Sequence, residues 1–121
     1  MKKVLIIEDD SFLLDLEAGK IKKNGYDVIV AQTGADGMKK INEEGVAIIL
    51  LDLLLPNFDG FEILKKIREG ETTKKIPVIV FSNLSENKDI EKAMKLGATK
   101  FMVKSNFSLE ELIDEIGILT K

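Results

Sequence analysis

Five polar residues of this 121-residue sequence stand at the ends of apolar runs: Glu8, Asp9, Asp52, Ser82 and Lys104. An unbroken apolar run, residues 47–51, is followed directly by Asp52 and then by a cluster of turn-forming residues. A carboxylate beside so much hydrocarbon is costly unless a cation, a hydrogen-bond donor or a chemical role offsets its desolvation. These five residues are therefore our candidates for chemistry.

The residue types favour phosphoryl chemistry with a bound metal ion. Crowded carboxylates repel one another unless a cation holds them. Oxygen ligands without His or Cys, both absent from this sequence, favour a hard ion such as Mg²⁺ or Mn²⁺. Lys104 would supply a positive charge, and Ser82 a hydrogen-bond donor, to an anion on Asp52. A carboxylate placed in this way can attack a phosphoryl group and form an acyl phosphate.

Taken singly, each candidate has an ordinary explanation. An acid after a strand often caps the next helix, and we interpret Asp10 in this way. A serine after a strand is commonly a turn residue, and a lysine is commonly a solvated surface charge. It is the joint occurrence of acids, a hydroxyl and an ammonium at the ends of four apolar runs that favours a functional site.

Strands and helices are expected to alternate along the chain. We expect strands at residues 4–7, 27–31, 47–52, 77–81 and 99–103. We expect helices at residues 11–23, from 33 to about 45, at 60–70, from a cap within 83–86 to 97, and from 108 through 116. In the first helix Phe12, Leu13 and Leu16 recur at helical spacing. Residues 59–62 and 108–111 have the spacing of capping boxes.

This alternation predicts a three-layer α/β fold with one doubly wound sheet. The strands are too apolar to face water, so a five-stranded parallel sheet with helices on both faces and right-handed crossovers is the economical arrangement. In such a sheet the ligand site lies beyond the carboxyl ends of the strands, where the strand order reverses. All five candidate residues are expected at that edge.

Composition narrows the remaining classes of function. Residues 1–121 have the length of one domain, and 45% apolar and 32% charged residues suit a globular protein. A net charge of −3 argues against direct nucleic-acid binding. The absence of His removes Ser/His triads and a phosphohistidine acceptor. No apolar run suggests a membrane span or a secretory signal, and no Cys is present, so we expect a cytoplasmic protein without membrane partners.

The sequence resembles the receiver domain of two-component response regulators over essentially its whole length. The resemblance is carried by residues 4–10 with their acidic pair, by the signature of residues 52–60, and by Ser82 and Lys104. It implies a flavodoxin-like fold with strand order 2-1-3-4-5. It also implies that Asp52 takes a phosphoryl group from a phosphohistidine of a partner histidine kinase or phosphotransfer protein. The missing His is then natural, because the donor histidine belongs to the partner.

The resemblance also implies a set of metal ligands. Asp9 and Asp52 would bind Mg²⁺, or Mn²⁺, directly. The backbone carbonyl group of Leu54 would complete the protein ligands, and Glu8 would act through water.

By the same resemblance, Ser82 and Lys104 would contact the phosphoryl group. Phe101 matches the aromatic switch residue of the family, which turns inward when the Ser or Thr hydroxyl group is drawn toward the phosphate. The output surface would be the last two helices with the strand between them, residues 85–121, and its partner a downstream effector protein. The chain would not be an enzyme, beyond catalysing its own phosphorylation and dephosphorylation.

Some positions depart from the family pattern. Lys104 is usually followed by a Pro in a cis peptide bond, but here Ser105 follows and Asn106 is an extra residue. A non-Pro cis bond costs about 2.5–4 kcal/mol. We therefore expect either a trans bond with a rearranged loop or a strained cis bond. Asn83 replaces the very small residue usual in the family, and we expect it to narrow access to Asp52. Phe101 lacks the hydroxyl group of the Tyr often found there.

The two positions that flank the phosphoryl group in the family are Leu54 and Leu84. Neither side chain can orient an attacking water, so we expect slow loss of phosphate.

Other classes of function fit the sequence less well. A phosphatase with an aspartyl-phosphate intermediate usually needs a second acid two residues after the nucleophile, where this chain has Leu54. A flavin-binding module would need a phosphate-binding loop after the first strand, and this sequence has none. The P-loop motif of nucleotide-binding enzymes is also absent. The stronger rival is a receiver-like scaffold that binds partners and no longer cycles phosphate, an alternative motivated by Asn83 and the changed loop after Lys104.

Overall fold

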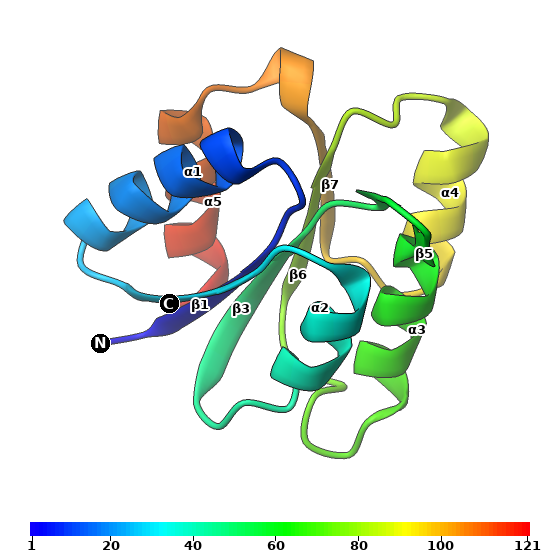
Figure 1. Ribbon diagram of the computed structural model, residues 1–121, viewed down its shortest axis with the longest axis horizontal. Coiled ribbons are helices and arrows are strands. Elements are labelled where there is room, and N and C mark those ends of the chain that lie inside the picture. Colours follow the sequence, from blue (N-terminus) through cyan, green and yellow to red (C-terminus); the bar gives the residue numbers. More distant parts are fainter.

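The computed structural model describes all residues, 1–121, and contains a five-stranded parallel sheet (Figure 1). The strands of the sheet are β1 (Lys3–Ile7), β2 (Asp27–Ala31), β3 (Val46–Leu51), β6 (Val78–Ser82) and β7 (Lys100–Val103). Their order across the sheet is β2-β1-β3-β6-β7, and every pair is parallel. Numbered by the five sheet strands alone, this is 2-1-3-4-5, so the expected fold is confirmed.

Five α-helices cover the two faces of the sheet (Figure 1). They are α1 (Ser11–Lys23), α2 (Gly34–Lys40), α3 (Gly60–Glu69), α4 (Asn87–Lys95) and α5 (Leu109–Leu119). Helices α1 and α5 lie on one face, and α2, α3 and α4 lie on the other. Successive strand side chains point to opposite faces, so each face has its own apolar core. One core holds Ile63, Leu64 and Ile67 of α3, and the other holds Leu112 and Ile116 of α5.

The sequence did not predict a small hairpin directly after β3. Strands β4 (Leu54–Leu55) and β5 (Phe58–Asp59) pair in antiparallel register outside the main sheet. Its turn places Asn57 at φ 55°, in the left-handed region that Asn tolerates. Gly60 then brings α3 against the chain after β3, because a Cβ at Gly60 would lie 2.5 Å from the Cα of Leu53. The hairpin thus fixes the backbone beyond Asp52.

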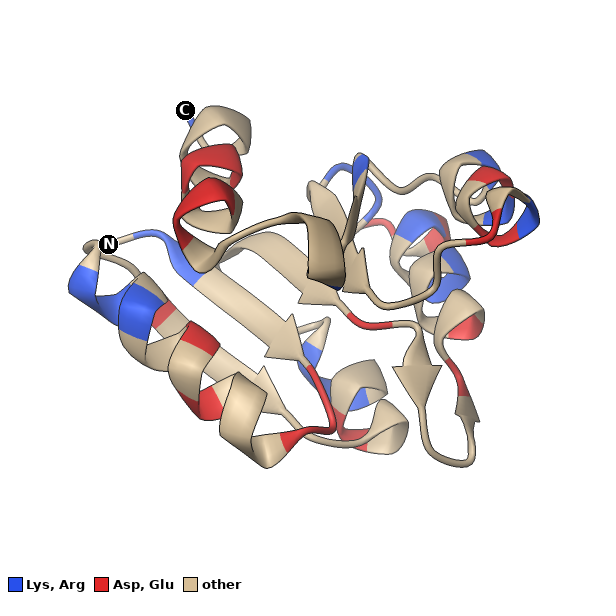
Figure 2. Ribbon diagram, turned by 90° about the horizontal axis from the view of Figure 1, so that it is seen from above, with Lys and Arg blue, Asp and Glu red and all other residues tan.

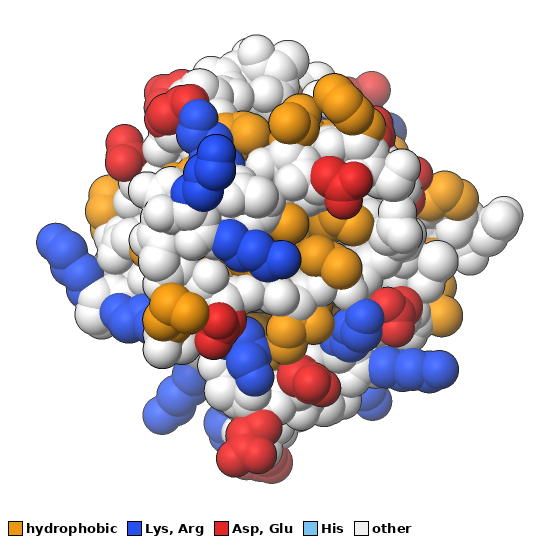
Figure 3. Space-filling model, turned by 60° about the vertical axis from the view of Figure 1, so that its left-hand side comes forward, with side chains coloured by type: hydrophobic (Ala, Val, Ile, Leu, Met, Phe, Trp, Pro, Cys, Tyr) orange, Lys and Arg blue, Asp and Glu red, His pale blue; other side chains and the backbone are white.

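Helix α1 does not bury all of the apolar residues whose spacing indicated a helix. Phe12 is 73% exposed and Leu16 is 47% exposed, whereas Leu14, Ala18 and Ile21 are buried. The side of the molecule that carries α1 shows apolar side chains lying among lysines and acids (Figure 3). The expected helix is therefore present, but the stripe that meets the sheet is formed by residues 14, 18 and 21.

The helix ends match the ends predicted from the sequence only in part. Asp10 is the N-cap of α1, with its side chain accepting from the Leu13 amide, and Ser108 forms the predicted capping box at α5. Asp59 caps α3 by accepting from the Phe61 amide, without the return bond of a full box. Helix α2 ends at Lys40, earlier than the expected Gly45.

Candidate active site at the carboxyl edge of the sheet

The candidate residues meet at one edge because parallel strands all end there. Glu8 follows β1, Asp52 follows β3, Ser82 is the last residue of β6, and Lys104 follows β7. Figure 2 shows acidic segments directly after two neighbouring arrowheads of the sheet. Strands β1, β3, β6 and β7 follow one another in the sheet order. Their carboxyl ends therefore lie close together, and Glu8 and Lys104 come into contact although they are far apart in the sequence.

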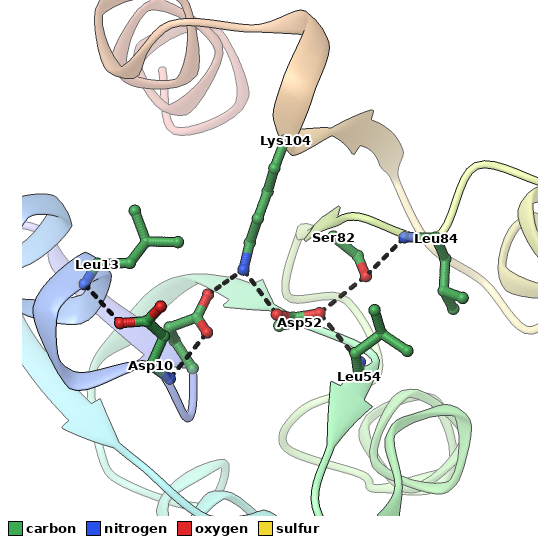
Figure 4. A network of polar contacts seen from close by, with 8 residues as sticks. Asp10, Leu13, Asp52, Leu54, Ser82, Leu84 and Lys104 are labelled. Carbon is green, nitrogen blue, oxygen red and sulfur yellow. Dashed lines mark hydrogen bonds and ion pairs between the residues drawn. The ribbon is translucent and has the colours of Figure 1, made fainter.

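Asp52 is buried and accepts three hydrogen bonds (Figure 4). Its Oδ1 accepts from Ser82 Oγ at 2.8 Å and from the Leu54 amide at 3.0 Å. Its Oδ2 accepts from Lys104 Nζ at 2.7 Å. These donors offset the cost of burying the carboxylate and hold both of its oxygens in fixed positions.

Lys104 joins two buried carboxylates. Its Nζ donates to Glu8 Oε1 as well as to Asp52, and Glu8 Oε2 accepts from the Asp10 amide at 3.1 Å. Burial alone would lower the pKa of Lys104, but the hydrogen bonds to Asp52 and Glu8 raise it above its usual range. The pKa of Glu8 is also raised, by burial and the nearby Asp52 charge, although Lys104 and the Asp10 amide act against this. Lys104 therefore stays charged at neutral pH.

The turn after β7 explains how Lys104 reaches the site. Residues Lys104–Asn106 form a short 3₁₀ helix, η1, and the chain contains no cis peptide bond. Of the two alternatives for the Lys104–Ser105 bond, the trans bond with a rearranged loop is correct, and the strained cis bond is wrong. The extra residue Asn106 completes the 3₁₀ turn, so the ammonium group reaches Asp52 without a proline.

Glu8, Asp9 and Asp52 form a group that can hold a cation. One carboxylate oxygen from each lies within 4.8 Å of the others. The donors are hard oxygens, two of the three residues are buried, and their charges exceed the single charge of Lys104. This donor set fits Mg²⁺, which takes a few carboxylates and keeps several waters.

The remaining predicted residues lie around Asp52. The Leu84 amide donates to Ser82 Oγ at 3.3 Å, and the Leu54 side chain is 49% exposed beside Asp52 (Figure 4). Phe101, on β7, is partly buried and packs with Leu84 against the core on the α3 side of the sheet. Asn83 is exposed.

The sequence reasoning missed Glu17. This residue of α1 is 2% exposed, and it lines a small void together with Glu8 and Asp52. The spacing of Leu14, Ala18 and Ile21 would have found it, because Glu17 occupies the same helical stripe.

Over residues 4–117 the sequence matches the family described as the response regulator receiver domain. The chain belongs to this family. Receiver domains are phosphorylation switches of two-component signal transduction, and the expected class of function is therefore confirmed.

Two relatives illustrate the match. The response regulator ArlR of Staphylococcus saprophyticus is 35% identical over 116 residues, which cover 96% of this receiver chain and 51% of ArlR. The DNA-binding dual master transcriptional regulator RpaA of Synechocystis is 32% identical over 121 residues, covering 100% of this chain and 50% of RpaA. The receiver chain thus spans about half the length of these relatives.

Solved receiver structures share the fold. The receiver domain of the Francisella response regulator 1452 has a TM-score of 0.88 at 31% identity, covering 99% of this chain and 97% of that one. A CheY-like receiver domain protein of Methanospirillum hungatei has a TM-score of 0.90 at 25% identity, covering 98% and 92%. No helix of the receiver is both long and apolar enough to cross a membrane.

Proposed function

We propose that Asp52 is the phosphoryl acceptor of this receiver domain. The observation that carries the proposal is the pair of donors on its carboxylate, Lys104 on one oxygen and Ser82 on the other. In the transfer, a carboxylate oxygen of Asp52 forms a bond to phosphorus while the bond from phosphorus to the donor nitrogen breaks. The donor is a phosphohistidine of a partner histidine kinase or phosphotransfer protein. Residues 1–121 act here as one receiver domain.

The residues around Asp52 would then serve the phosphoryl group. When Asp52 becomes an acyl phosphate it loses its own negative charge, and the phosphoryl oxygens become the strongest acceptors in the site. Lys104 Nζ and Ser82 Oγ already lie within 2.8 Å of the carboxylate, so each needs only a short movement to donate to those oxygens.

A cation completes the proposed site. Asp9 and Asp52 would hold Mg²⁺, or Mn²⁺, with the carbonyl group of Leu54, while Glu8 would act through water. When bound, the ion neutralises the negative charge that builds up during phosphoryl transfer.

Signalling would follow from the movement of Ser82. The Leu84 amide is bonded to the Ser82 hydroxyl group, and Leu84 packs against the same core as Phe101. A shift of that hydroxyl group toward phosphate would therefore move the chain that leads into α4 and let Phe101 turn inward. The affected surface is α4, β7 and α5, which would present the signal to an effector protein. The receiver's chemistry is confined to its own Asp52.

Intact mass after incubation with Mg²⁺ and a small acyl-phosphate donor tests the acceptor. We expect a gain of one phosphoryl group in the wild type and in Asp114→Asn, an exposed control on α5, and no gain in Asp52→Asn. Absence of the gain in the wild type with acyl-phosphate donors and with phosphorylated histidine proteins would overturn the proposal and favour a scaffold that does not cycle phosphate.

A further inference from the structure

Helix α1 carries a glycine that the chain itself does not require. Gly19 lies near the middle of the helix, where glycine lowers stability relative to alanine. It does not have a positive φ, and a Cβ built on it would meet nothing within 4 Å. Neither its backbone conformation nor a neighbouring element therefore calls for glycine. The remaining use of a glycine is to let the backbone of another molecule approach closely.

Gly19 lies in an open groove of about 400 Å³ on the exposed side of α1. Leu109 of α5 lines the groove together with six residues of α1: Asp15, Leu16, Gly19, Lys20, Lys23 and Asn24. These six residues form two rows with a spacing of four, which are the ridges by which helices pack against each other. An ion pair between Lys20 and Glu110 joins α1 to α5 beside the groove. The groove therefore has the form of a seat for another helix.

One of the two rows is complementary to itself. It consists of Asp15, Gly19 and Lys23, and all three residues are exposed. Neither Asp15 nor Lys23 forms an ion pair within the chain. When a second copy of α1 lies antiparallel across the first, with the two Gly19 residues facing each other, Asp15 of each copy meets Lys23 of the other. A parallel arrangement would bring like charges together, so the charges favour the antiparallel one.

Exposed apolar side chains lie beside this row. Phe12 and Leu16 project from α1 into solvent, and the side of the molecule that carries this helix shows apolar side chains among charged ones (Figure 3). In the antiparallel arrangement both would lie toward the C-terminal end of the second helix, over the hydrocarbon stems of its Lys22 and Lys23. Burial of this apolar surface on both copies would drive association, while the charges would set its orientation.

We propose that two copies of this chain associate through α1 in an antiparallel, two-fold symmetric contact centred on Gly19. The contact uses none of the residues assigned to phosphoryl transfer, so the inference is independent of the proposed function. One helix face from each copy buries less area than the roughly 1,600 Å² of a standard interface. We therefore expect a weak dimer, with a dissociation constant of about 10–100 µM, that weakens further as salt screens the charged pairs.

Sedimentation equilibrium of the full chain measures this association. Asp15→Lys and Lys23→Glu should each raise the dissociation constant by about tenfold or more, because each places like charges together at two symmetry-related positions. The chain that carries both substitutions has opposite charges facing each other again. It should dimerise with a dissociation constant within about threefold of the wild-type value.

The close approach at Gly19 has a test of its own. Gly19→Gln should raise the dissociation constant by about tenfold or more, because its side chain keeps the two helices apart, while Gln remains a good helix former. Lys39→Glu reverses an exposed charge on α2, on the other face of the sheet, and should dimerise as the wild type does. Circular dichroism of each variant checks that the fold is kept.

Two results would overturn the proposal. One is a wild-type chain that stays monomeric up to about 1 mM protein at low salt. The other is a dimer whose dissociation constant is the same in Gly19→Gln and in both single charge reversals, because the contact would then lie elsewhere. Either result leaves Asp52 untouched, since the phosphoryl mass gain tests that residue separately.

Discussion

Two leucines border Asp52, the proposed phosphoryl acceptor. Leu54 contributes its amide to Asp52, and Leu84 contributes its amide to Ser82, so both positions serve the site through the backbone. Their side chains are hydrocarbon and can neither accept a proton from a water molecule nor hold one in line with phosphorus. The backbone role survives substitution, which makes these side chains a clean place to change the lifetime of the phosphorylated state.

We expect Leu54→Asn and Leu84→Glu each to shorten the phosphorylated lifetime by roughly tenfold or more, because each adds a polar group that can orient a water molecule. The measurement is decay of the phosphoryl mass gain after the donor is removed. Leu54→Ala and Leu84→Ala are the controls, since they change size without adding a polar group. Unchanged decay in both polar variants would contradict the expectation.

The residues of the site could be predicted from the sequence where a polar residue directly follows an apolar run. Asp52 and Lys104 stand at the ends of apolar runs, and a parallel sheet gathers such ends at one edge. Glu17 could not be found in that way, because it lies in mid-helix and its burial depends on which stripe of α1 faces the sheet. The paths of the Lys104 and Glu8 side chains depend on packing that no local pattern encodes.

At the scale of elements, two helical glycines differ in the space available for a side chain. Gly60 begins α3 at a point where a Cβ would meet the backbone of Leu53 at 2.5 Å, so a side chain there would push α3 away from the end of β3. Gly19 lies within α1, and a Cβ there would meet nothing within 4 Å. Nothing within the chain explains Gly19.

Alanine at each glycine should therefore act in opposite directions. We expect Gly60→Ala to lower the free energy of unfolding by about 1–3 kcal/mol through overpacking. Gly19→Ala should raise it by about 0.5–1 kcal/mol, because Ala has the higher helix propensity. Urea unfolding followed by circular dichroism measures both. A loss of stability in Gly19→Ala would contradict the open space at Gly19. No loss in Gly60→Ala would contradict the close approach of Gly60 to the backbone of Leu53.

The alternating strands and helices were predictable because apolar residues recur with a different spacing in each. The hairpin of β4 and β5 was not, since two-residue strands are too short to show a period, and the cluster after Asp52 indicated only a turn. The early end of α2 was missed for a similar reason. Polar residues 42–44 are compatible with a helix, but they are exposed, so no buried apolar face holds them in one.

At the scale of the whole molecule, the acid cluster would tie the stability of the fold to a bound cation. Glu8, Asp9 and Asp52 come together only in the folded chain, so an ion that binds them favours folding. At a Mg²⁺ concentration one hundred times the dissociation constant, the gain is about 2.7 kcal/mol.

We therefore expect Mg²⁺ to raise the urea midpoint of the wild type, and chelation with EDTA to reverse the increase. Asp9→Asn should lose most of this response, because it removes one carboxylate of the cluster. Asp114→Asn, far along α5, should keep it. A response of equal size in Asp9→Asn and the wild type would mean that the ion acts elsewhere.

The contacts of Lys104 also determine when the site can form during synthesis of the chain. Its two carboxylate partners lie 96 and 52 residues earlier in the chain. A ribosome that adds about 5–20 residues per second needs roughly 3–10 seconds to proceed from Asp52 to Lys104. During that interval a nascent chain carries the Asp52 carboxylate without its ammonium partner. Under the proposed function, the last strand of the sheet to be synthesised therefore completes the phosphoryl-acceptor site.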